Sequence, residues 1–339
     1  MLTYRANDII IFKIQSTKQK VVKDNMLNRL CNAIGVSGYE DSVIHLLYDE
    51  IHNIVPNAVY IDKIGNLICK RSGDIGDKRI MICAHIDEVG FQIIKPIGDR
   101  KYRFRPMGNI KTQNAHHQRV ISGNSAGIIS AFDENRLEPH DYENLFLEII
   151  SDKEPGIGDV FTFDSQLEEN ERFYIGKALD NRIACCLLFN AIASDIKTKA
   201  DLYYVFTVQE EIGMRGIRYA KSIIKPDIYI NIDTSPENPM NSLIIENGVG
   251  IKVSDSMYVS SQRSVEWLTK LAEENNVSFQ LEVSDCGTSE LIISNEHDSG
   301  YEQIGLSLPC RNPHTANTVI SKHDISECEK LISLMLSSL

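Results

Sequence analysis

Histidine and acidic side chains stand at five places where the chain leaves a predicted strand or enters a predicted helix. Each of these side chains can bind a metal ion or move a proton. They are His85 and Asp87 in "MICAHIDEVG", Asp180 in "GKALDNR", Glu210 and Glu211 in "TVQEEIGMRG", Asp233 in "NIDTSPE" and His314 in "LSLPCRNPH". In open α/β sheets, ligands bind beyond the carboxyl ends of the strands. The pattern therefore predicts that these side chains converge on one site.

The types of side chain in this set favour a centre that holds two divalent metal ions. Imidazole and carboxylate ligands together suit Zn²⁺, with Co²⁺ and Mn²⁺ as further candidates. The set is too large for one tetrahedral ion, but it suits a hydrolytic pair of ions about 3.5–4 Å apart. The adjacent carboxylates of Glu210 and Glu211 would repel each other. A pair of cations would supply the positive charge that these carboxylates require.

The segments that carry these residues alternate between helix and strand after Tyr174. The apolar, β-branched run of residues 201–208 predicts a buried strand, whereas residues 182–194 and 325–338 have the apolar spacing of helices. Such alternation predicts a largely parallel or mixed sheet with helices on both faces. The expected architecture is an α/β domain with three layers, α/β/α.

The middle of the chain has a different pattern. Short β-like segments punctuated by Gly and Pro predict a small β-barrel or sandwich of about five to seven strands. We therefore expect three parts, in which an N-terminal extension precedes a catalytic α/β/α domain that is interrupted by an inserted β-barrel domain. The expected bounds are 1–25 for the extension, 26–91 and 174–339 for the catalytic domain, and 92–173 for the insertion.

A helix is also expected over residues 42–55, after the turn sequence "GVSGYED". Ser37 is a plausible N-cap, and Glu40 follows it three residues later. A Ser with Glu at that spacing is the signature of a capping box, in which each side chain accepts a hydrogen bond from the backbone N–H of the other residue. The sequence thus predicts that Ser37 and Glu40 serve the start of this helix.

Composition excludes several classes of protein. The 339-residue chain carries 47 acidic and 35 basic side chains, a formal net charge of −12, whereas nucleic-acid binding requires a basic face. No segment approaches the roughly 20 apolar residues of a membrane-spanning helix. Eight cysteines without a CxxC pair indicate buried thiols in a reducing compartment. We expect a cytoplasmic protein with neither a nucleic-acid nor a membrane partner.

The motifs "AHIDEVGF", "KALDNR", "TVQEEIGMRG" and "NIDTSPE", followed by His314, resemble the M42 metallo-aminopeptidases, the group of glutamyl aminopeptidase and the tetrahedral aminopeptidases. The similarity extends from about Met26 to the C-terminus, and the specificity lies in the order of the motifs. The resemblance implies a zinc-peptidase-like α/β/α domain that removes the N-terminal residue from short peptides. It also implies that the inserted barrel is a dimerisation domain and that dimers can assemble into a tetrahedral dodecamer.

The resemblance further implies a role for each site residue. His85 and Asp233 would hold one metal ion, and Glu211 and His314 would hold the other. Asp180 would bridge the two ions and would be followed by a cis peptide bond. Glu210 would be the general base that activates a metal-bridging water. Asp87 would orient the imidazole of His85 through a hydrogen bond.

Two segments depart from the family pattern. "CGTSE", residues 286–290, stands where "GGTDA" is usual, so that Ser289 replaces an aspartate, and "RNPHTANT" replaces "RYxHSxxE" around His314. Neither departure removes a proposed metal ligand, but both affect the expected substrate pocket. Two alternatives therefore stay open. One is a metal-dependent amidohydrolase or deacylase for an N-acylated or non-peptide amide, and the other is a catalytically weak oligomeric family member.

Overall fold

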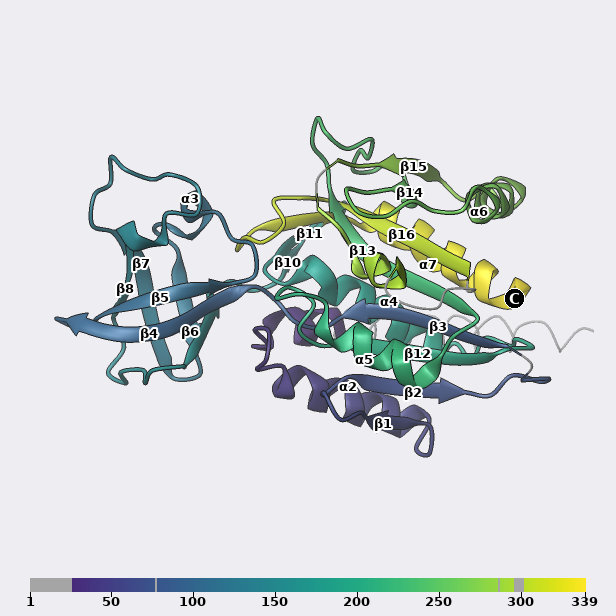
Figure 1. The fold of residues 1–339 in the computed structure, drawn as a ribbon, viewed down its shortest axis with the longest axis horizontal. Helices are drawn as coiled ribbons and strands as arrows, with labels where there is room; N and C mark the ends of the chain where they lie inside the picture. Colours follow the sequence, from purple (N-terminus) through teal and green to yellow (C-terminus); the bar gives the residue numbers. More distant parts are fainter. Residues whose placement is uncertain (1–25, 77, 286, 296–301) are drawn as a thin grey trace, which may run out of the picture.

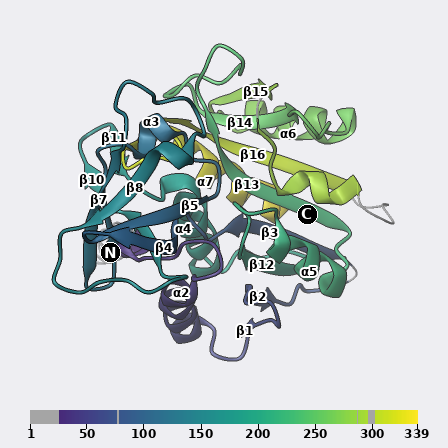
Figure 2. The same ribbon diagram turned by 60° about the vertical axis from the view of Figure 1, so that its left-hand side comes forward.

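The computed structural model describes residues 26–76, 78–285, 287–295 and 302–339, and the expected extension over residues 1–25 lies outside them. Figure 1 shows two parts side by side, a large α/β part and a smaller all-β part, joined by the long strands β4 and β5. The view in Figure 2, turned by 60°, brings the all-β part forward. The expected combination of an α/β/α domain with an inserted barrel is confirmed.

The large part is built on one mixed sheet of eleven strands. The strand order along the sheet is β1-β2-β12-β3-β13-β16-β17-β11-β10, and β14 pairs with β16 and β15 outside this path. The central strands β12, β3, β13 and β16 are parallel to one another. The strands are β1 (Val59–Ile61), β2 (Leu67–Arg71), β3 (Arg79–His85), β10 (Glu168–Glu169), β11 (Phe173–Gly176), β12 (Asp201–Thr207), β13 (Ile228–Pro236), β14 (Val249–Ser254), β15 (Phe279–Val283), β16 (Glu302–Arg311) and β17 (Thr318–Ser321).

Helices cover both faces of this sheet. Apolar side chains from one face pack with α2 (Asp41–Ile54), α4 (Leu179–Ala193), α6 (Gln262–Glu274) and α7 (Lys322–Ser338), and residues 26–32 are also helical. The other face packs with α5 (Arg215–Ile224) and the 3₁₀ helix η2 (Glu290–Asn295). The sequence of strand β3 is continuously apolar because both of its faces are buried. Ile80 and Ile82 pack in the core with α2, α4, α6 and α7, and Met81 and Cys83 pack in the core with α5 and η2.

The smaller part is a closed six-stranded barrel with the order β4-β5-β8-β7-β6-β9. Its strands are β4 (Gly90–Gly98), β5 (Lys101–Met107), β6 (Arg119–Ser122), β7 (Ser125–Ala131), β8 (Leu145–Ile149) and β9 (Val160–Phe163), with the short helices α3 (Thr112–Ala115) and η1 (Tyr142–Asn144). Phe91 packs edge-on against Phe104 and Phe163 inside the barrel. The barrel strands span residues 90–163, whereas we had expected the insertion over 92–173; β11 instead pairs with β17 in the large sheet.

A buried ionic cluster fastens the barrel to the large sheet. Nζ of Lys177 lies 2.9 Å and 3.0 Å from the two carboxylate oxygens of Glu88, and both side chains are buried. Oγ1 of Thr162, on barrel strand β9, donates to the same carboxylate at 2.6 Å. The guanidinium of Arg182 lies 3.5 Å away and donates to the carbonyl oxygen of Ile86. Removal of one partner from such a buried ion pair would leave the other charge buried without compensation, which destabilises the fold.

The predicted capping box is wrong. Helix α2 begins at Asp41 with Glu40 as N-cap, and no side chain caps it. Oγ of Ser37 donates to Oδ2 of Asp87 at 2.6 Å, and the carboxylate of Glu40 accepts from the N–H groups of Gly38 and Gln209. The two side chains have tertiary partners near the strand ends, and those partners compete successfully with the helix terminus.

Two smaller predictions concern cysteines and membranes. The seven cysteines among the described residues are buried thiols, while Cys286 lies outside the described residues. Across the described ranges, no helix combines the length and the apolar character that crossing a membrane requires.

Candidate metal centre

The residues singled out in the sequence meet at the carboxyl ends of the central parallel strands. His85 is the last residue of β3, and Asp233 lies near the end of the neighbouring β13. Nε2 of His85 is 3.5 Å from Oδ1 of Asp233 and 3.3 Å from Oδ1 of Asp180. Glu210 and Glu211 follow β12, whose last residue, Thr207, pairs with His85.

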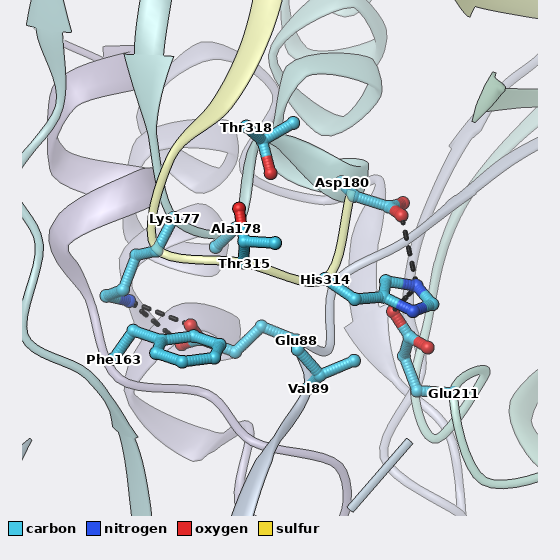
Figure 3. A pocket seen from close by; sticks show the side chains of 10 residues that line it. All are labelled: Glu88, Val89, Phe163, Lys177, Ala178, Asp180, Glu211, His314, Thr315 and Thr318. Carbon is cyan, nitrogen blue, oxygen red and sulfur yellow. Dashed lines mark hydrogen bonds and ion pairs between the residues drawn. The ribbon is translucent and has the colours of Figure 1, made fainter. Parts of the chain in front are cut away.

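His314 completes the cluster from the loop between β16 and β17. Its Nε2 lies 3.3 Å from Oδ2 of Asp180 and 3.2 Å from Oε1 of Glu211. Figure 3 shows the ring pointing at these two carboxylates, with the Glu88–Lys177 pair at the opposite end of a small pocket. The other ring nitrogen, Nδ1, is 2.8 Å from the backbone carbonyl oxygen of Asn109, which follows β5. The barrel segment that follows β5 therefore helps to orient the imidazole ring of His314.

Asp180 lies between the two histidines and presents one oxygen to each of them. It stands at the start of α4, where the backbone is not yet helical, and the peptide bond to Asn181 is cis as expected. Nδ2 of Asn181 donates to the carbonyl oxygen of Ile232 at 2.8 Å and so ties this turn to β13. The position of Asp180 is thus fixed relative to the strand that carries Asp233.

Asp87 is completely buried and connects three parts of the centre. Oδ1 accepts from the N–H of Glu210 at 2.9 Å, and Oδ2 accepts from the N–H of Glu211 at 3.0 Å. Oδ1 also lies 3.5 Å from Nδ1 of His85. The hydrogen bond from Ser37 described above holds the carboxylate from a fourth side. Asp87 therefore positions both the imidazole of β3 and the two glutamates after β12.

The loop that carries the two glutamates is held by close packing against the hairpin of β1 and β2. Oδ1 of Asn66 accepts from the N–H of Val208 at 3.0 Å, and its Nδ2 donates to the carbonyl oxygen of Gly216 at 2.9 Å. A Cβ on Gly216 would lie 2.3 Å from Oδ1 of Asn66 and 2.5 Å from the carbonyl oxygen of Val208. Only glycine permits this approach of α5 to the end of β12.

The pKa values of the acids and imidazoles in the centre depend on one another. Burial lowers the pKa of His85, but Asp180, Asp233 and Asp87 outweigh it and raise this pKa well above its usual value. The pKa of His314 is likewise raised well above its usual value, because Glu211 and Asp180 outweigh its burial. The protonated imidazoles supply positive charge that the carboxylates need.

The carboxylates respond in different directions. Burial raises the pKa of Glu210 well above its ordinary value, and the neighbouring carboxylates of Glu211, Asp233 and Asp87 raise it further. Burial also raises the pKa of Glu211. For Asp180, the hydrogen bonds with His314 and His85 outweigh burial and hold its pKa below the ordinary range. Acids with opposite shifts in one site are typical of functional sites.

The residues present fit a divalent metal centre. One donor atom each from His85, Asp180 and Glu211 lies within 4.8 Å of the other two. The two histidines and the surrounding carboxylates are the ligand types that Zn²⁺ and similar ions bind. A bound cation would take the place of the imidazole protons as the source of positive charge, since metal ligands must be deprotonated.

A cavity of about 1070 Å³ opens over the cluster. Its lining includes His85, Asp233 and Glu210 of the cluster. It also includes residues of the barrel segment that follows β5, such as Lys111. Lys252 also lines it, is only 5% exposed, and lies 3.3 Å from Oε1 of Glu282. Sequence reasoning missed Lys252, and no sequence signal marks a lysine within a strand as part of a site.

Three further positioning residues were also missed or misassigned. Asn66 was expected only at or near a hairpin turn, and Ser37 and Glu40 were assigned to a helix cap. Their polar side chains lie close in sequence to turns, where local hydrogen bonds are the usual explanation. Each of the three has a partner 50 or more residues away in sequence, and local patterns do not reveal such partners.

Comparisons with known proteins identify the family and the fold. The sequence profile of the M42 glutamyl aminopeptidase family matches residues 65–331. A relative from Acetivibrio thermocellus, provisionally named an aminopeptidase, is 32% identical over 91% of this chain and 96% of its own length. A solved structure from Thermotoga maritima, named an endoglucanase, is 28% identical with a TM-score of 0.76, covering 92% of this chain and 96% of that one.

A second solved structure shows the fold at greater sequence distance. It is the TET1 peptidase of Pyrococcus horikoshii, which can assemble into a tetrahedron or a large octahedral shell. This protein is 23% identical with a TM-score of 0.81, and the match covers 94% of this chain and all of the other. The profile match spans most of the chain and includes every residue of the cluster. The protein belongs to the M42 glutamyl aminopeptidase family.

Proposed function

We propose that the protein is an exo-aminopeptidase that uses two divalent metal ions to remove the N-terminal residue from short peptides. The observation that carries the proposal is the position of Asp180. Its Oδ1 is 3.3 Å from Nε2 of His85 and its Oδ2 is 3.3 Å from Nε2 of His314. A carboxylate that presents one oxygen to each of two imidazoles is the arrangement expected of a ligand shared by two ions.

The remaining ligands divide between the two ends of Asp180. His85 and Asp233 would hold one ion, and their contact of 3.5 Å supports that pairing. Glu211 and His314 would hold the other, with a contact of 3.2 Å in support. When bound, the two ions supply Lewis-acid polarisation of the attacking water and of the peptide carbonyl. The donor set suits Zn²⁺ or Co²⁺, with Mn²⁺ as a further candidate.

Glu210 is the proposed general base. It lines the cavity beside the cluster, and its pKa is raised above the ordinary glutamate value, chiefly by burial. In the proposed reaction its carboxylate takes a proton from the attacking water and gives that proton to the leaving amine. A positioned base of this kind contributes roughly 10²–10⁴ in rate. The hydrogen bond from its N–H to Asp87 keeps the side chain at the cavity edge.

Asp87 is proposed as a positioning residue. Through its contact with Nδ1 of His85, Asp87 favours the tautomer that carries the proton on Nδ1. In that tautomer the lone pair of Nε2 is on the side of Asp180 and Asp233. Carboxylates behind a ligating histidine fix its ring and raise its basicity. The same carboxylate holds the backbone of both glutamates. One buried group therefore positions the proposed base relative to the proposed metal ligands His85 and Glu211.

The wider setting of the enzyme is also part of the proposal. The barrel would serve as a dimerisation domain, and dimers would assemble further, as the P. horikoshii relative does. The buried thiols of the described cysteines support a reducing, cytoplasmic location. The cavity of about 1070 Å³ is large enough for the first residues of a peptide.

A matched substrate panel tests the proposal against its alternatives. The metal-loaded protein is incubated with one pentapeptide in two forms, with a free and with an acetylated N-terminus. We expect release of single residues from the free form only. Turnover confined to the acetylated form would establish the deacylase alternative instead, and no turnover of either would favour a weak family member. A β-glucan oligosaccharide is the third arm, because the T. maritima relative is named an endoglucanase.

A further inference from the structure

A second group of metal-binding side chains lies on the barrel, away from the centre described above. It consists of His116, His117 and Glu134, and one donor atom from each lies within 4.8 Å of the other two. The histidines directly follow α3, and Glu134 follows β7 in the loop that leads toward β8. Figure 1 shows α3 at one end of the barrel. None of the three belongs to the proposed catalytic set.

The distances within this group suit a single bound ion. Nε2 of His117 lies 3.5 Å from Oε1 of Glu134, and Nε2 of His116 lies 4.0 Å from the same oxygen. Zinc binds imidazole nitrogen at about 2.0–2.1 Å and carboxylate oxygen at about 2.0–2.2 Å, so a nitrogen and an oxygen ligand of one ion lie at most about 4.3 Å apart. Both contacts fall inside that limit without movement of the backbone.

His116 supplies an independent sign that a partner belongs here. Its side chain is only 9% exposed, and its Nε2 is buried without a hydrogen-bond partner among the described residues. A buried polar atom without a partner costs free energy and requires an explanation. The ring of His116 is stacked on that of His117, with centroids 3.6 Å apart, so the unpaired nitrogen lies beside the other two ligands.

The backbone holds the three side chains in place. The N–H of His117 donates to the carbonyl oxygen of Ile129 at 2.8 Å, although His117 itself has a left-handed φ of +62°. Glu134 lies in a turn closed by the N–H of Arg136, which donates to the carbonyl oxygen of Asp133. The side chains of His117 and Glu134 are 64% and 65% exposed, so water can complete the coordination.

We propose that His116, His117 and Glu134 form a third metal site, a peripheral site for Zn²⁺ or another divalent transition ion. Two imidazoles and one carboxylate are ligands that such ions prefer, and Mg²⁺ or Ca²⁺ would instead require mostly oxygen ligands. One ion can contact all three side chains at once, and it would supply the partner that Nε2 of His116 lacks among the described residues.

The site would also act on the wall of the substrate cavity. The cavity lining includes Lys111, Gln113, Asn114 and Gln118, which surround the two histidines in sequence. An ion that joins the histidines to Glu134 would fix the segment 111–118 against the loop after β7. The peripheral ion would therefore order one wall of the cavity without taking part in the reaction.

The test measures zinc bound per chain over a series of buffered free zinc concentrations, with the full-length protein. The variants are His117→Asn, which tolerates the left-handed backbone, and Glu134→Gln. Both positions are exposed, so neither variant removes a core contact. The matched control is His140→Asn, which removes an exposed histidine of the barrel outside the group at a position that also has a left-handed backbone (φ of +64°).

We expect both variants to bind one zinc per chain fewer than the wild type and the control. Hydrogen exchange supplies a second readout, since zinc should slow amide exchange in segment 111–118 of the wild type but not of His117→Asn. Because the comparison is a difference between variants, failure of the proposed catalytic centre would not imitate the result. Equal zinc curves for the wild type and either variant would overturn the proposal.

Discussion

The backbone N–H of Glu210 donates to Oδ1 of Asp87 at 2.9 Å, so the proposed base is held by a carboxylate from the neighbouring strand end. Oδ2 of the same carboxylate holds the N–H of Glu211. One buried carboxylate therefore holds the backbone of both adjacent glutamates. Several outcomes follow from this arrangement and from the contacts that support it.

Replacing Asp87 by asparagine should lower metal affinity or kcat/KM by about 10–100-fold. The amide presents N–H donors where the carboxylate accepted from Glu210, Glu211 and Ser37. Metal titration and steady-state kinetics measure the two effects. Asp49→Asn, an exposed change on α2, is the control and should match the wild type. An Asp87→Asn variant with wild-type affinity and rate would show that the carboxylate is dispensable.

Replacing Glu88 by glutamine should lower the free energy of unfolding by about 3–5 kcal/mol, because Lys177 and Arg182 would stay buried without a counter-charge. Urea unfolding at neutral pH measures this loss. Glu171→Gln, at an exposed position, is the control. A change below about 0.5 kcal/mol, typical of surface substitutions, would contradict the structural role of the pair.

The same glutamate predicts a pH dependence. Burial raises the pKa of Glu88, but Lys177 and Arg182 outweigh it and hold this pKa below its ordinary value. A depressed pKa stabilises the fold above the unfolded value of about 4.3, and this stabilisation is lost as the pH falls through the folded pKa. The urea midpoint of the wild type should fall more steeply below about pH 4.3 than that of Glu88→Gln. Parallel curves would refute this assignment.

A Gly216→Ala substitution should destabilise the fold by about 1–3 kcal/mol and reduce kcat. The added Cβ would lie 2.3 Å from Oδ1 of Asn66, so α5 would have to move and shift the loop that carries the glutamates. Thermal unfolding and kinetics measure the two effects. Ser222→Ala, on the exposed side of the same helix, should change neither. Wild-type stability in Gly216→Ala would show that this close approach is not required.

Removal of metal by a chelator should lower the melting temperature, and added Zn²⁺ or Co²⁺ should restore it. A ligand at 1,000 times its Kd stabilises the native state by about 4 kcal/mol, which corresponds to roughly 6 °C for a chain of this size. The His314→Ala variant should respond less, because it lacks one proposed ligand. An unchanged melting temperature after complete metal removal would argue against ions bound at the cluster.

The sequence predicted the site through its strand ends. His85, Glu211 and Asp233 follow apolar runs that form adjacent parallel strands, so their convergence needed only the α/β architecture. The order of the roles of Glu210 and Glu211 came from the family resemblance, since spacing alone does not distinguish two neighbours. In the structure, their backbone N–H groups bind the two different oxygens of Asp87.

Local patterns failed where distant partners decide the structure. Ser37 and Glu40 match a capping box, but Asp87 and the N–H of Gln209 bind them instead. The pairing of the short strands near the expected end of the insertion also depends on distant residues, because β10 pairs with β11, which pairs with β17, more than 140 residues later in the chain. Such long-range contacts leave no periodic signal in the segment itself.

The most direct test of the proposed mechanism is the rate of Glu210→Gln on a free-amine peptide, with bound metal quantified in the same samples. Glutamine keeps the size of the side chain and the hydrogen bond from the backbone to Asp87, but it cannot take a proton from water. We predict that kcat falls by about 10²–10⁴-fold while the metal content equals that of the wild type. A wild-type kcat at equal metal content would contradict the role of Glu210 as the general base.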